Sequence, residues 1–268
     1  MSSIRPAAVA GSFYPGDPSA LAAEVAAYLA EAPTSRTPAM APKAIIAPHA
    51  GYMYSGAIAG SIYARLAPLR GVVRRVVLAG PAHRVYVRGV AISSADAFAS
   101  PLGSVPLDLE ALAMLRGLDF VEVSDKAHAL EHSLEVHLPF LQSVLGDIRL
   151  VPVVVGDAST QDMARLFGLL WGGAETLIVV SSDLSHYLSY DSARGRDRDT
   201  ARAIVGLDAS LVPDEACGAA PINGLLQAAR EHGLVAEMVD LRNSGDTAGG
   251  LDRVVGYGAF AFSEARHA

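Results

Sequence analysis

The clearest indication of the fold is the segment Ala44-Ile45-Ile46-Ala47-Pro48-His49-Ala50-Gly51. Its apolar start predicts a short buried strand, and residues 57–66 follow with an apolar helical pattern. The strand therefore ends in a histidine on a glycine-bounded turn before a helix, where open α/β sheets place their ligands. Residues 75–83 repeat the design and end in a second histidine. If the two strands are neighbours, His49 and His83 project into one crevice.

Composition and periodicity place the chain among α/β proteins. Of its 268 residues, 51% are hydrophobic and 18% are charged. This apolar excess suits a sheet covered on both faces, whose strands are continuous runs of Val, Ile and Leu. Strands alternate with helical patterns, so we predict one α/β domain over residues 1–268, with a mixed, largely parallel central sheet and helices on both faces. The predicted strands lie at residues 44–47, 75–83, 90–93, 120–123, 150–156, 176–183, 235–241 and 254–262.

Charge and hydropathy argue against two kinds of partner. The formal net charge is −7 and no basic tract occurs, which argues against nucleic acid. No stretch reaches the roughly 18 consecutive apolar residues of a membrane span, and the N-terminus lacks the features of a signal peptide, so a cytoplasmic location is expected.

The single cysteine, Cys217, rules out an internal disulfide and a cysteine-based metal cluster. We interpret Cys217 as a small buried residue.

Polar groups that can carry chemistry follow several predicted strands, namely His49, His83, Asp183, His186 and Asp246. Strand ends on one edge of an α/β sheet converge, so scattered positions can share one pocket. Two imidazoles and one carboxylate (here His49, His83 and Asp246) form the ligand set of non-haem iron(II) oxygenases, and the same set with a bound water serves a hydrolytic zinc site. Spacing alone does not choose between the two metals.

These residues also have structural interpretations. A histidine after a strand is more often a hydrogen-bonded structural residue than a metal ligand. On local grounds Asp246 is a turn residue or a helix cap. Residues 183–186 read either as a cap with a surface histidine or as polar groups at a pocket edge, where a general base is useful. His132 and Glu135, three residues apart, predict a shared helical face that supports the site, or else charged residues in a first helical turn.

Six motifs run through the chain in order: RPAAVAGSFYP at 5–15, PHAGYMYSG at 48–56, GPAH at 80–83, EHSLEVHLPF at 131–140, SSDLSH at 181–186 and NSGDT at 243–247. Together they resemble the Memo-like family, whose bacterial members are often labelled AmmeMemoRadiSam system protein B. Because the motifs span nearly the whole chain, the resemblance is specific at the level of the family.

The resemblance implies a relative of the class III extradiol ring-cleavage dioxygenases, with an α/β fold and a pocket at the strand ends. It implies metal ligation by His49 and His83, with Asp246 at the position where animal members carry a cysteine and the dioxygenases a glutamate. A two-histidine, one-carboxylate set favours a hard ion of the ferrous type. The base position of the dioxygenases falls on His186, with Asp183 beside it.

We therefore expect a non-haem iron(II) oxidoreductase that resembles extradiol dioxygenases, with Tyr52, Tyr54, His132 and Glu135 lining its pocket. Zinc and copper are the alternative metals. A zinc hydrolase that uses the same residues, or a protein that only binds a ligand in this pocket, are the alternative functions. The expected partner is a small molecule or a peptide. The resemblance further implies a functional association with a radical-SAM protein and an AMMECR-type protein.

Overall fold

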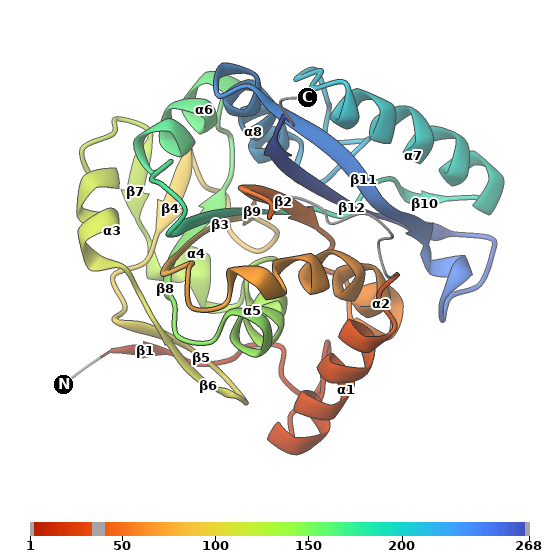
Figure 1. Cartoon of the computed structure of the whole chain (residues 1–268), viewed down its shortest axis with the longest axis horizontal. Helices are drawn as coiled ribbons and strands as arrows, with labels where there is room; N and C mark the ends of the chain where they lie inside the picture. The colour runs from red at the N-terminus through yellow and green to blue at the C-terminus, as the bar shows by residue number, and fades with distance from the viewer. Residues whose placement is uncertain (1–2, 34–40, 266–268) are drawn as a thin grey trace.

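A nine-stranded mixed sheet forms the centre of the computed structural model, which describes residues 3–33 and 41–265 (Figure 1). Its strands are β2 (Ala44–Ala47), β3 (Arg75–Pro81), β4 (Val90–Ile92), β7 (Val121–Val123), β8 (Arg149–Val155), β9 (Thr176–Ser181), β10 (His186–Leu188), β11 (Leu234–Asn243) and β12 (Val254–Glu264). They follow the order β10-β12-β2-β9-β3-β8-β4-β7, and β11 also pairs with β12.

The four central strands run parallel and the outer strands introduce antiparallel pairs. β2, β9, β3 and β8 are hydrogen-bonded side by side in parallel, whereas β12 is antiparallel to β2 and β4 is antiparallel to β8. Nearly every residue of the central strands is buried, as their continuous apolar runs predict. The sheet is thus mixed with a parallel centre, which confirms the fold class expected from the sequence.

Helices cover both faces of this sheet (Figure 1). The α-helices are α1 (Pro18–Ala30), α2 (Tyr52–Tyr63), α3 (Leu109–Leu115), α4 (Asp125–Ala129), α5 (Leu138–Leu145), α6 (Thr160–Leu169), α7 (Tyr190–Val205) and α8 (Ala219–Glu231). The 3₁₀ helices are η1 (Ala64–Leu69), η2 (Glu135–His137) and η3 (Ser244–Asp246). α2 packs with α1 and α5 and contacts β2 and β12, and α8 packs with α6 and contacts β3 and β9. In the described part of the chain, no helix has the length and apolar character needed to span a membrane.

A second, three-stranded sheet lies beside the main one and consists of β1 (Ile4–Arg5), β5 (Ala97–Ser100) and β6 (Gly103–Pro106). β5 and β6 form an antiparallel hairpin, and β1 pairs in parallel with β5. This pairing fixes the N-terminal segment against residues that lie far away in the sequence.

The parallel centre brings three chain segments to one edge of the sheet. β2, β9 and β3 are neighbours in register, with Ala47 opposite Ser181 and Ala79 opposite Val180. Each strand points its carboxyl end the same way, so the segments that follow them meet beyond that edge. His49, His83 and Asp183 each lie two residues beyond their strand.

Candidate metal centre

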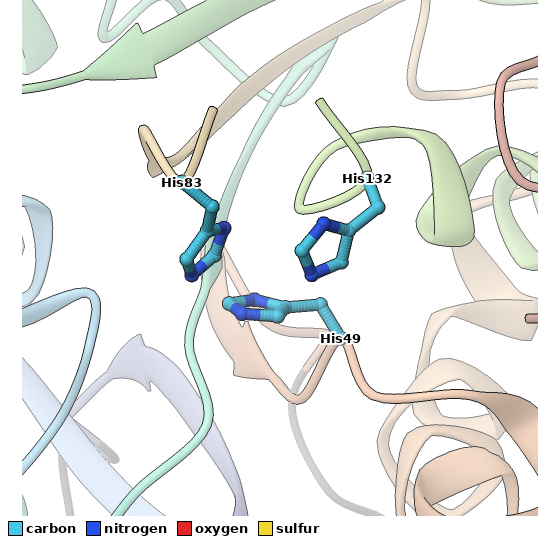
Figure 2. Close-up of side chains that lie close together, drawn as sticks. All are labelled: His49, His83 and His132. Atoms are coloured by element: carbon cyan, nitrogen blue, oxygen red, sulfur yellow. The ribbon is translucent and has the colours of Figure 1, made fainter. Parts of the chain in front are cut away.

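Three imidazoles meet at the carboxyl edge of the parallel strands (Figure 2). His49 follows β2, His83 follows β3, and His132 lies between α4 and η2. Each offers one ring nitrogen as a ligand atom, and these three nitrogens lie within 4.8 Å of one another. The ring centroid of His49 is 5.2 Å from that of His83 and 5.6 Å from that of His132. Imidazole nitrogens bind zinc at about 2.0–2.1 Å, so a group of this size could hold a single ion.

Ser181 fixes the protonation of His49. The hydroxyl of Ser181 donates to the carbonyl oxygen of Ser133 at 2.6 Å, so it accepts at 2.6 Å from the Nδ1–H of His49. The lone pair of the ring is therefore on Nε2. Burial, followed by the neighbouring histidines, lowers the pKa of His49 well below its ordinary value, so the ring is neutral and able to bind a metal.

Glu131 stands behind His83. The Nδ1 of His83 lies 2.9 Å from Oε1 of Glu131, and the backbone N–H of His83 donates to Oε2 at 2.6 Å. Burial acts to raise the pKa of Glu131, but hydrogen bonds from the side chain and backbone of His83 and from the backbone of Ser133 lower it to about 2. The side chain of His83 is 28% exposed, so part of it is open to solvent.

His132 completes the group. Its ring stacks on that of His83, with centroids 4.7 Å apart and planes 23° apart, and Phe13 contacts it at 4.8 Å. Burial lowers the pKa of His132 to about 4, so this ring is also neutral near pH 7. Its Nδ1 is buried, has no hydrogen-bond partner among the described residues, and lies 3.4 Å from Oε1 of Glu131. A neutral ring can bind a metal through the nitrogen that carries no proton.

Asp183 supplies a buried carboxyl group next to His49. Its Oδ1 accepts from the backbone N–H of His49 at 2.8 Å. Burial raises the pKa of Asp183 to about 7, so the group can exchange a proton near neutrality. His186 is half-buried, and burial, partly opposed by a backbone hydrogen bond, lowers its pKa, with a smaller effect from His83.

Cys217 lies at the lone pair of His49, which its sequence position did not indicate. Its Sγ is 3.4 Å from Nε2 of His49 and accepts from the backbone N–H of Asp183 at 3.3 Å. Burial, followed by the charge of Asp183, raises the pKa of Cys217 to about 12, so the group is a neutral thiol. The residue is intermediate in exposure rather than fully buried. A single cysteine far along the chain carries no spacing signal that would connect it to His49.

Asp246 lies outside the group of three histidines. Its Oδ1 accepts from the hydroxyl of Tyr190 at 2.5 Å, and its Oδ2 accepts from the backbone N–H of Asn243 at 2.9 Å. The second bond belongs to a capping box at the N-terminal end of η3. In this conformation Asp246 has the cap role that local sequence indicates, while His132 stands with His49 and His83.

The shared helical face expected for His132 and Glu135 is wrong, because residues 131–134 lie outside the helices and α5 begins only at Leu138, with Pro139 in its first turn. Glu135 is instead fully enclosed. It accepts from the backbone N–H groups of Ala8 and Val9 and pairs with Arg5. Glu135 thus anchors the N-terminal segment.

The two tyrosines after His49 differ in exposure. Tyr52 is buried, donates its hydroxyl to the carbonyl oxygen of Val136 at 2.7 Å and packs on Phe140. Tyr54 is intermediate in exposure and lies in the first turn of α2, three residues after Gly51. Of the two, Tyr54 is the more accessible to a ligand.

Comparison with known proteins gives a consistent assignment. The family model described as "Memo-like protein" matches residues 5–261. A MEMO1 family protein of Aquifex aeolicus is 34% identical, covering 95% of this chain and 97% of the relative. A MEMO1 family protein of Methanopyrus kandleri is 33% identical, covering 96% and 98%. Among solved structures, an uncharacterised protein from Escherichia coli K12 matches with 15% identity and a TM-score of 0.49, over 80% of this chain and 98% of that one. The chain belongs to the Memo-like family.

Proposed function

We propose that this protein is a metal-dependent enzyme whose ion is held by His49, His83 and His132. The observation that carries the proposal is the approach of three potential ligand atoms to within 4.8 Å of one another. The lowered pKa values of His49 and His132 support it, because metal ligation requires the neutral imidazole. The buried carboxylate behind His83 adds the negative charge that a cation needs nearby.

The metal we propose is iron(II) and the reaction class is oxidation, on the strength of the resemblance between the motifs of this chain and the dioxygenase-related family. When bound, such an ion would supply Lewis-acid and redox chemistry at its open positions. The protein would hold the ion through His49 and its partners, and Asp183 would hold or release a proton beside His49. His186 is the second candidate for proton transfer.

A zinc hydrolase is the second candidate, and one specific observation favours it. Three histidines meet here, and three histidines with a water in the open fourth position form a known catalytic zinc site, in which the ion activates that water as a nucleophile. Copper is the third metal to test, since imidazole and sulfur ligands both suit it and the Cys217 thiol is close. Asp183 would serve a hydrolase as the proton-accepting group.

Metal analysis of protein purified without oxygen and reconstituted separately with iron(II), zinc and copper tests the proposal. We expect stoichiometric metal in the wild type and near-complete loss in the His49→Ala/His83→Ala double variant. His132→Ala and Asp246→Ala form an informative pair, because only the first removes a member of the histidine group. We expect His132→Ala to weaken binding and Asp246→Ala to retain it.

Three results would contradict parts of this proposal. If the wild type binds none of the three metals, the proposed metal centre is wrong and the alternative of a ligand-binding protein is favoured. If His132→Ala keeps its bound metal and Asp246→Ala loses it, Asp246 is the third ligand. Oxygen uptake by the iron form with catechol-like compounds supports the oxidoreductase, whereas ester hydrolysis by the zinc form without oxygen uptake supports the hydrolase.

A further inference from the structure

We infer that Glu131 is the positioning residue of this site: one buried carboxylate holds the segments of both His83 and His132 and fixes which nitrogen of His83 faces the metal. The inference deepens the proposed metal site and rests on it for its functional meaning. Its structural content, the orientation and tautomer of His83, can be measured in the metal-free protein.

The contacts of Glu131 are unusually complete. Its Oε1 accepts from Nδ1 of His83 at 2.9 Å and from the backbone N–H groups of His132 and Ser133, both at 3.0 Å. Its Oε2 accepts from the backbone N–H of His83 at 2.6 Å. The side chain is 2% exposed. One carboxylate thus ties the turn after β3 to the segment after α4, which are 48 residues apart.

These contacts determine the chemistry of His83. An ionised carboxylate can only accept hydrogen bonds, so the Nδ1 of His83 must carry the proton and Nε2 must carry the lone pair. A carboxylate behind a metal-binding imidazole orients the ring and raises its basicity. The same oxygen fixes the backbone of His132, so His83 and His132 are stacked before any metal arrives.

The site requires a carboxylate rather than a group of the same shape. Glu131 is the acceptor in each of these four hydrogen bonds. A glutamine has one accepting oxygen and one donating NH₂ group, so in either orientation its NH₂ group would face at least one N–H donor. Glu131→Gln therefore removes the charge and creates a donor–donor conflict with almost no change in volume.

Glu135 provides a matched control four residues further along. It is as buried as Glu131, and its oxygens accept from the backbone N–H groups of Ala8 and Val9 and from the hydroxyl of Tyr14, besides pairing with Arg5. No hydrogen bond joins it to the three histidines in the described part of the chain. Glu135→Gln thus carries the same burial and loss of charge without disturbing the orientation of His83.

The experiment has two readouts. Ring ¹⁵N chemical shifts report the tautomer of His83 in the metal-free protein, and titration with Co²⁺ reports affinity. We expect a single Nδ1–H tautomer in the wild type and in Glu135→Gln. In Glu131→Gln we expect a mixture of tautomers and an affinity about 10–100-fold lower. Glu135→Gln is expected to bind Co²⁺ as the wild type does, although it unfolds at a lower temperature.

Unchanged tautomer and affinity in Glu131→Gln, or an equal loss of affinity in Glu135→Gln, would overturn the inference. If Glu131→Gln does not fold, Glu131→Asp replaces it, because it keeps the charge but withdraws the oxygens from His83 by one methylene. An unchanged His83 tautomer and affinity in that variant would equally overturn it. A wild type that binds no Co²⁺ contradicts the proposed function, while the tautomer of His83 still decides the role of Glu131.

Discussion

Ser181 connects His49 to a neighbouring part of the chain through a two-step hydrogen-bond chain. It accepts from the His49 ring and donates to the carbonyl oxygen of Ser133, one residue beyond His132. Because the hydroxyl has a single proton, the direction of both bonds is fixed. Ser181 is fully buried at the last position of β9, so the sheet itself determines which nitrogen of His49 faces the site.

Ser181→Ala should therefore reduce both stability and metal affinity. The substitution leaves the Nδ1–H of His49 and the carbonyl oxygen of Ser133 without partners, which costs about 1–3 kcal/mol for a buried group. Loss of the group that orients a metal-binding histidine is expected to weaken metal binding about 10–100-fold. Urea unfolding and Co²⁺ titration measure the two effects.

Ser61→Ala is the control for this change. Ser61 is as buried, but its hydroxyl donates within α2, to the carbonyl oxygen of Ile58. Metal affinity should be unchanged in this variant. Equal affinities for Ser181→Ala and the wild type would show that Ser181 does not orient His49.

At the level of single residues, sequence located the histidines that directly follow strands better than the histidine that lies in a loop. His49 and His83 stand directly after apolar runs, and the structure brings them together. Sequence placed His132 in the pocket but not as a third ring beside His49 and His83. The helical spacing assumed for His132 and Glu135 hid a segment whose path is set by hydrogen bonds to Glu131. Cys217 reaches His49 only through the packing of α8 and its preceding turn.

At the level of elements, two glycines allow α2 to lie close to α1. A Cβ at Gly60 would lie 2.5 Å from the backbone oxygen of Tyr28, and one at Gly56 would lie 2.5 Å from the ring of the same residue. The hydroxyl of Tyr28 in turn donates to the carbonyl oxygen of Tyr52, in the first turn of α2. The position of α2, and with it the turn that carries His49, depends on this close contact.

Gly60→Ala should destabilise the protein, because backbone atoms of α1 cannot move away as a flexible side chain would. Overpacking of this kind costs about 1–3 kcal/mol. Gly195→Ala is the matched control in α7, where no atom of the described part of the chain lies within 4 Å of the added Cβ, and it should stabilise the protein by about 0.5–1 kcal/mol. Urea unfolding of both variants measures the difference, and a neutral Gly60→Ala would show that the two helices can separate without cost.

Elements with a strong apolar pattern were predictable and elements with mixed faces were not. The central strands were predicted because both of their faces are buried. The start of α7, at Tyr190, has no such apolar pattern. Its first turns bury Ala193 and Asp197 rather than large apolar side chains, so no stripe marks them.

At the scale of the whole molecule, two buried histidines outside the metal group make stability depend on pH. Burial lowers the pKa of His128 to about 4 and that of His137 to about 3. Each has one buried ring nitrogen for which residues 3–33 and 41–265 provide no hydrogen-bond partner. In the unfolded chain both rings titrate near the ordinary value of about 6.5, so acid favours the unfolded state. Their contribution to stability is fully present above that value and is lost as the pH falls toward 4.

His128→Gln tests this linkage, because a glutamine amide can replace the hydrogen bond from Nε2 of His128 to the carbonyl oxygen of Ala91 without titrating. Between about pH 7.5 and about pH 5.5, one such histidine lowers the free energy of unfolding by about 1.4 kcal/mol. The loss of stability over this interval should be smaller by that amount in His128→Gln than in the wild type, with metal removed from both by a chelator. His232→Gln is the control for the loss of a histidine ring as such, since His232 is exposed and its ring centroid lies 3.9 Å from that of Trp171. Parallel profiles for His128→Gln and the wild type would mean that His128 binds its proton equally in the folded and unfolded states, and its burial would then have no effect on acid stability.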